Sequence, residues 1–154
     1  MKLSTQSRYG VRAIFDIAYN SPHSPAQIKD IYRRQRIPAR YLEQIFQKLR
    51  KNGFLVSKRG PRGGYMLKKP PDQIKVGDII RSVEGHSMIV FCTEIEGSRK
   101  KCTLYDKCVT KKVWQEGCNR LFGYFDSISI ADLCKMAKEM GIRQELGHQL
   151  SFVI

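Results

Sequence analysis

A mainly α-helical fold is predicted by three features of this 154-residue sequence. Apolar residues recur at three- and four-residue steps over much of the chain, which is typical of amphipathic helices. Two short apolar segments flank a basic, glycine-rich stretch near residue 60, which predicts one β-hairpin. A further helical pattern begins after residue 110. Together these features predict a winged helix-turn-helix with a short β-hairpin wing, followed by a long C-terminal dimerisation helix.

The first two helices are predicted from their capping residues. Ser4 or Thr5 caps a helix that is expected to end near Asn20. Ser24 followed by Pro25 predicts the start of a short second helix, because serine caps helices and proline is tolerated in the first turn. This second helix is expected to bury its isoleucines and to expose three basic residues. These are Lys29, Arg33 and Arg34.

The third helix and the hairpin follow directly. Pro38 is a suitable first-turn residue, and Asn52-Gly53 is a suitable end. The apolar face of this helix consists of Leu42, Ile45, Phe46 and Leu49. Segments 54–56 and 65–67 are the expected strands of the hairpin. An amphipathic helix followed by a basic hairpin is the arrangement of a recognition helix and its wing, so double-stranded DNA at a promoter operator is the predicted partner.

The predicted DNA contacts fall into three groups. Side chains near the start of the third helix are expected to reach base edges: Tyr41, Glu43 and Gln44. Arginines of the wing suit the minor groove, whose negative potential attracts them: Arg59 and Arg62. The residues assigned to phosphates are Arg33, Arg40, Lys48 and Lys58. For each of these residues the alternative is an ordinary solvated charge.

The charge distribution supports a nucleic-acid partner. The net charge of +14 favours a polyanion, either nucleic acid or an anionic membrane. Residues 1–80 hold 17 Lys and Arg against 5 Asp and Glu, whereas residues 81–154 hold 11 against 9. The basic excess therefore lies with the predicted DNA reader. No apolar run approaches the ~20 residues that span a bilayer, and the first residues lack a signal peptide's apolar core. We expect no membrane partner and a cytoplasmic location.

The second half of the sequence predicts a dimer. A short helix is expected at 76–83, and a last helix begins after the capping residue Ser129. Between them a heptad seam runs through Trp114, Cys118, Leu121, Phe125 and Ile128. Such a seam packs against a partner helix, here that of a second copy, although packing on its own domain is the alternative. The expected organisation is a DNA-binding domain at 1–83, a cysteine-bearing loop at 84–109, dimerisation helices at 110–141 and a tail at 142–154.

The five cysteines fall into two classes. Cys118 and Cys134 lie on apolar helix faces, where a free cysteine behaves as a small buried side chain. Cys92, Cys102 and Cys108 share one loop, separated by nine and by five residues, with no apolar stripe to account for them. Thiolates gathered by a loop suit an iron–sulfur cluster or zinc. Their spacing leaves both metals open.

Three segments carry a resemblance to a known family. LSTQSRYGVRAI, YLEQIFQKLRKNGF and RGPRGGYML resemble the winged helix-turn-helix regulators of the IscR/NsrR/CymR type, most of all the IscR-like members, over nearly the whole chain. The resemblance implies a transcriptional regulator with an iron–sulfur cluster, a 2Fe–2S form being favoured over a 4Fe–4S form. It also implies that three loop cysteines hold the cluster, which here are Cys92, Cys102 and Cys108.

Two departures from the family pattern concern the cluster ligands. The gap between Cys92 and Cys102 is longer than in IscR-like proteins. Lys111 stands where those proteins place a histidine ligand, and a protonated lysine has no lone pair to donate. Some members use an acidic residue from the first helix of the partner subunit, where this sequence has Arg8. The remaining candidates for a fourth ligand are His86, Glu94, Glu96, Asp106 or a small thiol.

The predicted function is a homodimeric regulator in which cluster occupancy orders the cysteine loop and biases the two DNA-reading heads. One alternative is a zinc-stapled DNA-binding regulator without redox sensing. A small redox or electron-transfer protein is the other, but such a carrier has no need for a basic reading head. The sequence has no catalytic triad, P-loop or dinucleotide fingerprint, so we do not expect an enzyme.

Overall fold

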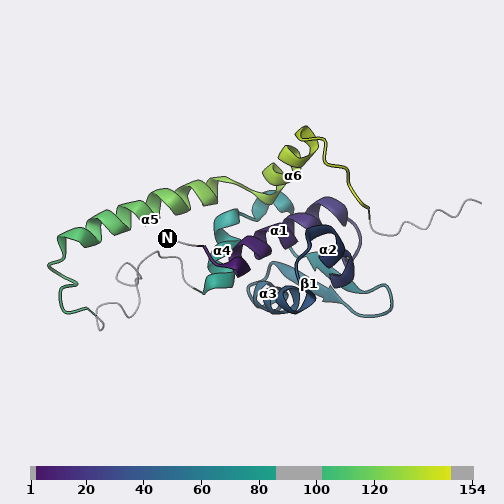
Figure 1. Cartoon of the computed structure of the whole chain (residues 1–154), viewed down its shortest axis with the longest axis horizontal. Helices are drawn as coiled ribbons and strands as arrows, with labels where there is room; N and C mark the ends of the chain where they lie inside the picture. The colour runs from purple at the N-terminus through teal and green to yellow at the C-terminus, as the bar shows by residue number, and fades with distance from the viewer. Residues whose placement is uncertain (1–2, 86–101, 147–154) are drawn as a thin grey trace, which may run out of the picture.

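A computed structural model describes residues 3–85 and 102–146 of the chain, and Figure 1 shows their arrangement. The α-helices of this part are α1 (Thr5–Asn20), α2 (Ile28–Gln35), α3 (Ala39–Lys51), α4 (Val76–Glu84), α5 (Val109–Ser127) and α6 (Ile130–Glu139). The hairpin consists of β1 (Leu55–Lys58) and β2 (Gly64–Leu67), and a short 3-10 helix η1 (Pro71–Gln73) follows it. The prediction of a mainly helical fold with one short hairpin is confirmed.

Residues 3–85 form the part of the chain called the head below. Helix α1 lies at its centre, because it packs against α2, α3, α4 and α6. The Ser4 side chain caps its start by accepting a hydrogen bond from the backbone N–H of Ser7. The buried faces of α1 and α3 share one hydrophobic core, which includes Ala13, Ile14 and Ile17 of α1 and Leu42, Ile45, Phe46 and Leu49 of α3. Burial of each large aliphatic side chain stabilises the fold by about 1.5–3 kcal/mol. This core therefore fixes the predicted recognition helix firmly to the head.

Helix α2 begins later than its capping pattern predicts. Its first residue is Ile28, not Pro25. Ala26 instead pairs with Tyr65 of β2, where the N–H of each residue donates to the carbonyl oxygen of the other at 2.9 Å. This pairing holds residue 26 outside the helix. The predicted start was wrong because a contact between distant parts of the sequence outweighed the local signal.

The side chain of Arg34 on α2 is almost fully buried, although the sequence predicts that it is exposed. Its guanidinium donates to both carboxylate oxygens of Asp16 on α1, with distances of 2.7, 3.0 and 3.1 Å. The side chains of Arg34 and Asp16 are 5% and 0% exposed. The amides of Asn20 and Gln35 also donate to Asp16. A hydrogen-bonded ion pair thus joins α1 to α2, and a charge without such partners could not be buried there.

A tight turn connects α2 to α3. Arg36 takes the left-handed conformation with φ 54°, and its backbone N–H donates to the Tyr32 carbonyl oxygen. Ile37 follows with its side chain fully buried, and Pro38 immediately precedes α3. At the other end, Gly53 has φ 77°, the left-handed conformation predicted for the helix terminus. The predicted helix-turn-helix is therefore present.

The wing hairpin is held at its base by packing and pairing. Its register runs from Leu55 opposite Leu67 to Lys58 opposite Gly64. The ring of Tyr65 packs on Phe46 of α3, with centroids 4.6 Å apart. A Cβ atom at Gly64 would lie only 2.3 Å from the carbonyl oxygen of Ala26, so a side chain at position 64 is excluded. The hairpin stem is therefore attached both to α3 and to the segment before α2.

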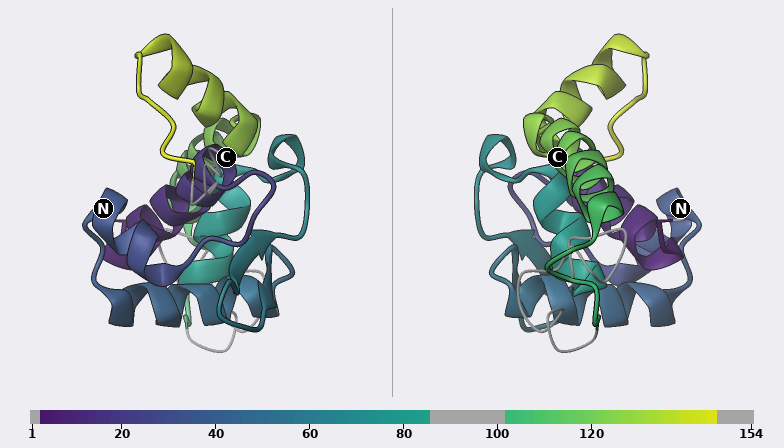
Figure 2. Two further views of the ribbon diagram at one scale, coloured as in Figure 1. Left: turned by 90° about the vertical axis from the view of Figure 1, so that its right-hand side faces the viewer. Right: turned by 90° about the vertical axis from the view of Figure 1, so that its left-hand side faces the viewer.

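The C-terminal helices leave the head and return to it. In Figure 1, α5 projects away from the head, and α6 folds back over α1. Figure 2 looks along α5 and shows it beside α4. A capping box of Ser129 and Asp132 starts α6, as the sequence predicts, and Ile130 lies in the core of the head. Of the two C-terminal helices, α6 thus packs on its own chain, whereas the partner-facing role of α5 and the domain boundaries stay predictions.

Across the two described ranges, no helix is both long enough and apolar enough to cross a bilayer.

Candidate nucleic-acid interface and metal centre

Helix α3 presents a polar face to solvent because its apolar face is anchored in the core. Arg40, Tyr41, Glu43 and Gln44 are all exposed on the outer side. The Tyr41 ring is placed by an edge-on contact with Tyr9 of α1 at a centroid distance of 6.0 Å. These four residues include the three that the sequence assigns to base edges. The structure therefore gathers them at the first two turns of a rigidly packed helix.

A hollow of about 340 Å³ lies at the start of α3 and is lined by Gln6, Arg40, Tyr41 and Gln44. Gln6 comes from the first turn of α1 and is not among the residues predicted to contact DNA. No spacing or composition signal distinguishes it, because its place at this surface depends on how α1 packs across α3. Its amide adds a polar group beside the predicted base-reading residues.

Lys48 of α3, which the sequence assigns to a phosphate, makes two hydrogen bonds within its own chain. Its ammonium donates to the carbonyl oxygen of Val83 at 2.7 Å and to the Gln6 side chain at 2.8 Å. Val83 lies in the last turn of α4, where a positive charge is favourable to the helix dipole. Lys48 thus joins α3 to α1 and α4 instead of extending freely from the surface.

The wing tip carries Lys58, Arg59 and Arg62, and all three are exposed. Gly60 has φ 110°, a conformation that favours glycine, and a Cβ atom at Gly63 would lie 2.2 Å from the Lys58 carbonyl oxygen. The glycines therefore permit the tight turn that presents the basic side chains. Figure 1 shows the hairpin beside α3 on the same side of the head, so the wing and the recognition helix form one surface.

Arg33 on α2 is also exposed, but it faces the tail. Its guanidinium is 2.7 Å from the Glu145 carboxylate, and the two side chains are 60% and 52% exposed. The backbone N–H of Glu145 donates to the Asn20 side chain at 2.8 Å, and the Tyr19 hydroxyl donates to the Ile142 carbonyl oxygen at 2.6 Å. Residues 142–145 therefore dock on the C-terminal end of α1, and Glu145 places an acidic group on a predicted phosphate contact.

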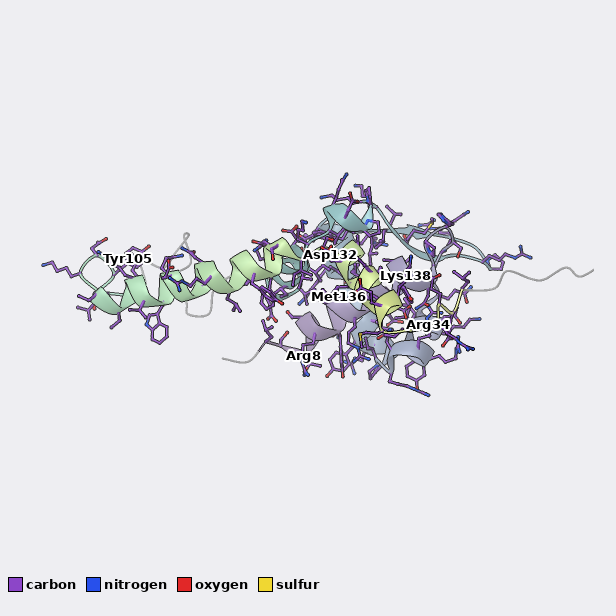
Figure 3. All side chains as sticks on the ribbon, turned by 90° about the horizontal axis from the view of Figure 1, so that it is seen from above. Arg8, Arg34, Tyr105, Asp132, Met136 and Lys138 are labelled. Atoms are coloured by element: carbon purple, nitrogen blue, oxygen red, sulfur yellow. The ribbon has the colours of Figure 1, made fainter. Side chains whose placement is uncertain are left out.

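Two of the three predicted cluster ligands lie in the described part of the chain. Cys102 and Cys108 bracket a turn that precedes α5, and both are partly exposed. Cys92 lies outside the described residues. Figure 3 places Tyr105, which belongs to this turn, at the far end of α5 from the head. The structure thus sets Cys102 and Cys108 apart from the predicted DNA-reading surface.

Cys108 occupies the position that immediately precedes α5, where its sulfur meets the helix terminus. A hydrogen bond joins Cys108 Sγ to Thr110 Oγ1 at 3.2 Å. This bond is the largest cause of a lowered Cys108 pKa, and the backbone N–H groups of Lys111 and Thr110 act in the same direction. A thiolate is the form that binds iron. The chemistry of this donor therefore fits an iron–sulfur cluster.

Lys111, at the histidine position of IscR-like proteins, folds back on the turn. Its ammonium lies 3.4 Å from the centroid of the Tyr105 ring and donates to the Tyr105 carbonyl oxygen at 3.4 Å. Its charge also favours the Cys108 thiolate. Lys111 therefore supports the turn and the neighbouring sulfur but supplies no ligand. Among the residues that the structure describes, no three His, Cys, Asp or Glu side chains gather as a metal site.

The candidate fourth ligands divide in the same way. Asp106 lies in the described turn between the two cysteines and is exposed. The others, His86, Glu94 and Glu96, lie outside the described residues.

The two helical cysteines differ from the loop pair: Cys118 is buried on α5, and Cys134 is half-buried where α6 packs on the core. Burial raises the pKa of Cys134, which opposes formation of its thiolate. Their environments agree with the sequence-based expectation of packed thiols.

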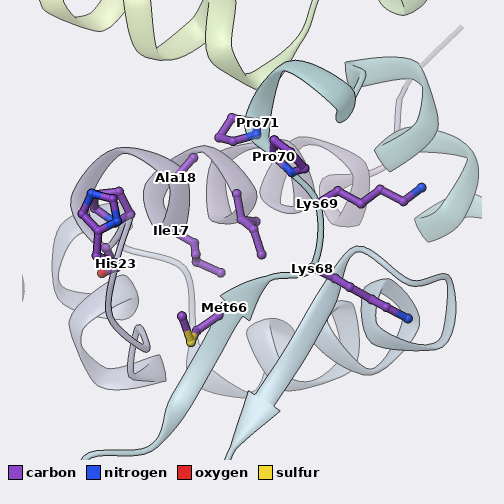
Figure 4. Close-up of a pocket in the computed structure, with 11 residues that line it drawn as sticks. Ile17, Ala18, His23, Met66, Lys68, Lys69, Pro70 and Pro71 are labelled. Carbon is purple, nitrogen blue, oxygen red and sulfur yellow. The ribbon is translucent and has the colours of Figure 1, made fainter.

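A second hollow, of about 390 Å³, lies between the end of α1, β2 and the segment before η1 (Figure 4). Ile17 and Met66 are among its apolar residues. The side chains of Lys68 and Lys69 extend away from them, and the Lys69 ammonium instead lies 5.4 Å from the centroid of the Phe54 ring. Polar groups do not converge here as they do in a ligand site.

Comparisons with known proteins agree with this geometry. The Rrf2 family model, described as an iron-dependent transcriptional regulator, matches residues 3–136. The HTH-type transcriptional regulators IscR of Cronobacter sakazakii and of Escherichia coli K12 are each 41% identical over 133 residues, which cover 86% of this chain and 80% of theirs.

Two solved structures are also similar. That of T. potens IscR has a TM-score of 0.73 and 40% identity, covering 94% of this chain and 93% of its own. That of CymR, described as the global cysteine regulator of B. subtilis, has a TM-score of 0.72 and 31% identity, covering 88% and 98%. The resemblance and the winged-helix fold that the sequence predicts are both confirmed.

Proposed function

Because this chain belongs to the Rrf2 family of iron-dependent transcriptional regulators, we propose that it is a homodimer that reads an operator and senses an iron–sulfur cluster. Its relatives are DNA-binding regulators, so the prediction of a regulator and not an enzyme is confirmed. The observation that carries the proposal is the pairing of two features. One is the exposed surface of α3 and the wing, and the other is the pair of loop thiols at the start of α5.

Each DNA-reading residue has a proposed role that follows from its chemistry. Glu43 accepts from a cytosine amino group, Gln44 pairs with adenine, and Tyr41 completes the base-reading surface. Arg59 and Arg62 enter the minor groove from the wing. The phosphate contacts are Arg33, Arg40 and Lys58, and Arg33 contacts a phosphate only when it leaves Glu145.

Arg59→Ala weakens specific DNA binding by about 1–3 kcal/mol, the typical loss for one groove arginine. The matched control is Lys138→Ala, which removes an exposed cation from α6. Titration of both variants against the operator by fluorescence anisotropy measures the difference. Equal affinities for wild type and Arg59→Ala would contradict the wing assignment.

The proposed dimer rests on the apolar surface of α5. Val113, Trp114 and Tyr124 are 65%, 47% and 62% exposed. Exposed apolar side chains of this size along one projecting helix suit a helix of a second copy. Cys118, Leu121 and Phe125 of the predicted seam are buried or partly buried. Within the predicted seam, Trp114 is thus the exposed residue, and Val113 and Tyr124 add exposed apolar surface beside it.

Trp114→Asp produces monomers, because dimer formation would bury a carboxylate and charge burial costs several kcal/mol. The isolated fold tolerates the change, since Trp114 is half exposed. Sedimentation velocity measures the oligomeric state, and circular dichroism verifies the helix content. Asn119→Asp, at an exposed position of the same helix outside the seam, is the control and leaves the dimer intact. A folded Trp114→Asp dimer would exclude this interface.

The proposed sensor uses Cys92, Cys102 and Cys108 as cluster ligands, with a 2Fe–2S cluster favoured. A bound cluster supplies a redox-active, labile group at the start of α5. The chain's own contribution is the thiolate environment at Cys108, which Thr110 and the first backbone N–H groups of α5 provide. Ligation by these three cysteines would join the loop to the start of α5 and would thereby bias the paired heads by linkage.

A further inference from the structure

Among the described elements, α4 is the main helical neighbour of α5. Two backbone hydrogen bonds lie at the junction: the Val76 N–H donates to the Ile128 carbonyl oxygen at 3.0 Å, and the Ile130 N–H donates to the Ile74 carbonyl oxygen at 2.9 Å. Both lie at the C-terminal end of α5, while its N-terminal end projects away from the head (Figure 1). The angle of α5 is therefore set close to one end.

Arg81 of α4 makes the side-chain contact at this junction. Its guanidinium donates to the two carboxylate oxygens of Asp126 at 2.5 and 3.2 Å, and to Asp78 at 2.9 Å. It also lies over the ring of Phe122, 5.3 Å from the centroid. A guanidinium and a carboxylate joined by two hydrogen bonds restrict rotation of the two side chains more than a single hydrogen bond does. The contacts on Asp126 and Phe122 hold the last two turns of α5.

Close packing adds to this restraint. A Cβ atom at Gly77 would lie 1.9 Å from Asp126 Oδ1, so the carboxylate rests directly against the first turn of α4. A negative charge is favourable at a helix N-terminus, where backbone N–H groups point outward. Asp126 is therefore fixed by Arg81 on one side and by the start of α4 on the other.

A small rotation at this junction becomes a large displacement along α5. Trp114 lies twelve residues before Asp126. At ~1.5 Å per residue this corresponds to about 18 Å, so a 10° change of angle moves the dimer surface by about 3 Å relative to the head. One base-pair step along DNA is ~3.4 Å. The junction thus controls the head position on the scale of a single base pair.

We propose that Arg81 is a positioning residue whose pair with Asp126 sets the angle between α5 and the reading head, and with it the half-site spacing that the dimer accepts. This inference rests on the proposed dimer through α5. Arg81 lies on α4, away from the predicted base-reading residues of α3 and the wing. Its effect is therefore on spacing and not on the recognition of either half-site.

The test uses full-length protein with its cluster and DNA probes that carry two half-sites selected by the wild-type protein from a random library. The spacer is the selected length or is one or two base pairs shorter or longer. Asp126→Asn preserves the shape of the side chain and removes the charge. Glu116→Gln is the matched control, because it breaks the exposed 2.7 Å pair with Arg120 elsewhere on α5.

We expect the wild type and Glu116→Gln to prefer one spacer at least tenfold over its neighbours. In Asp126→Asn the preference falls below about threefold or moves by a base pair, while binding to a single half-site stays within twofold. A folded Asp126→Asn dimer with the wild-type spacer preference would overturn the inference. If this variant does not fold, Arg81→Lys decides by the same criteria, because it keeps the charge and loses the two-bond geometry.

The same experiment separates the inference from the proposed function. A wild-type protein that sediments as a monomer would refute the proposed dimer, and the role of the junction with it. A wild-type dimer with a spacer preference that Asp126→Asn leaves unchanged would refute only the role of Arg81. Loss of binding to a single half-site in Asp126→Asn would also count against the inference, since the head itself would then be damaged.

Discussion

Asp16→Ala lowers the free energy of unfolding by about 3–5 kcal/mol, because it leaves the Arg34 charge buried without its partner. Arg34 and Asp16 are 5% and 0% exposed, so water cannot replace the lost carboxylate without opening the α1–α2 contact. The amides of Asn20 and Gln35 lose an acceptor at the same time. Urea unfolding followed by circular dichroism measures the change.

The tail supplies a matched control for this prediction. Glu145→Ala also removes the carboxylate of an arginine pair at 2.7 Å, but both partners are more than half exposed. Exposed pairs contribute roughly 0–1 kcal/mol, so this variant unfolds close to the wild type. Asp16→Ala combined with Arg34→Met recovers part of the loss, since no unpaired charge remains. If Asp16→Ala and Glu145→Ala had equal free energies of unfolding, the buried pair would contribute no more to stability than the exposed pair.

Cys102→Ala and Cys108→Ala each abolish the cluster, whereas Cys118→Ala and Cys134→Ala retain it. Removal of one loop thiolate leaves too few soft donors, while Cys118 is buried and Cys134 is half-buried on the helices. Anaerobic purification followed by visible absorption and iron and sulfide analysis measures cluster content. The two helical variants lose about 1 kcal/mol of stability at most, through the small cavities they create.

Other outcomes of the cysteine experiment would each exclude part of the proposal. A wild-type protein that is colourless and holds zinc would favour the zinc-stapled alternative. If Cys118→Ala lost its colour while Cys92→Ala kept it, the third ligand would be Cys118. That result would require the buried thiol of α5 to leave its packed environment, since Cys118 is 1% exposed.

The sequence predicts those parts of the fold that depend on local signals. Ser4 and Ser129 cap the helices they were expected to cap, because their hydroxyls need only a backbone N–H three residues away. The apolar face of α3 and the glycine at its end are likewise local patterns. The basic tip of the wing was predictable because few other structures place a glycine-rich basic stretch between two short strands.

The contacts that the sequence misses join residues far apart along the chain. Arg34 looks like an exposed cation on a helical wheel, and only the approach of Asp16 makes its burial favourable. The sequence also gives no sign that α4 brings the Val83 carbonyl oxygen within hydrogen-bond distance of Lys48. Arg33 meets Glu145, and Gln6 joins the α3 surface, for the same reason. A charged or amide side chain can either face solvent or join a hydrogen-bond network inside the chain. Its role therefore depends on tertiary packing.

The pairing of Ala26 with Tyr65 has a consequence for the entropy of DNA binding. Fixing the backbone of one residue costs about 1–2 kcal/mol of conformational entropy. The two strands of the wing contain eight residues. If they became ordered only on DNA, the cost would reach about 8–16 kcal/mol, comparable with the ~12 kcal/mol of a nanomolar complex. Because Ala26 and Phe46 already hold the stem, the wing is preorganised for the proposed groove contact, and only the residues of its tip have freedom left to lose.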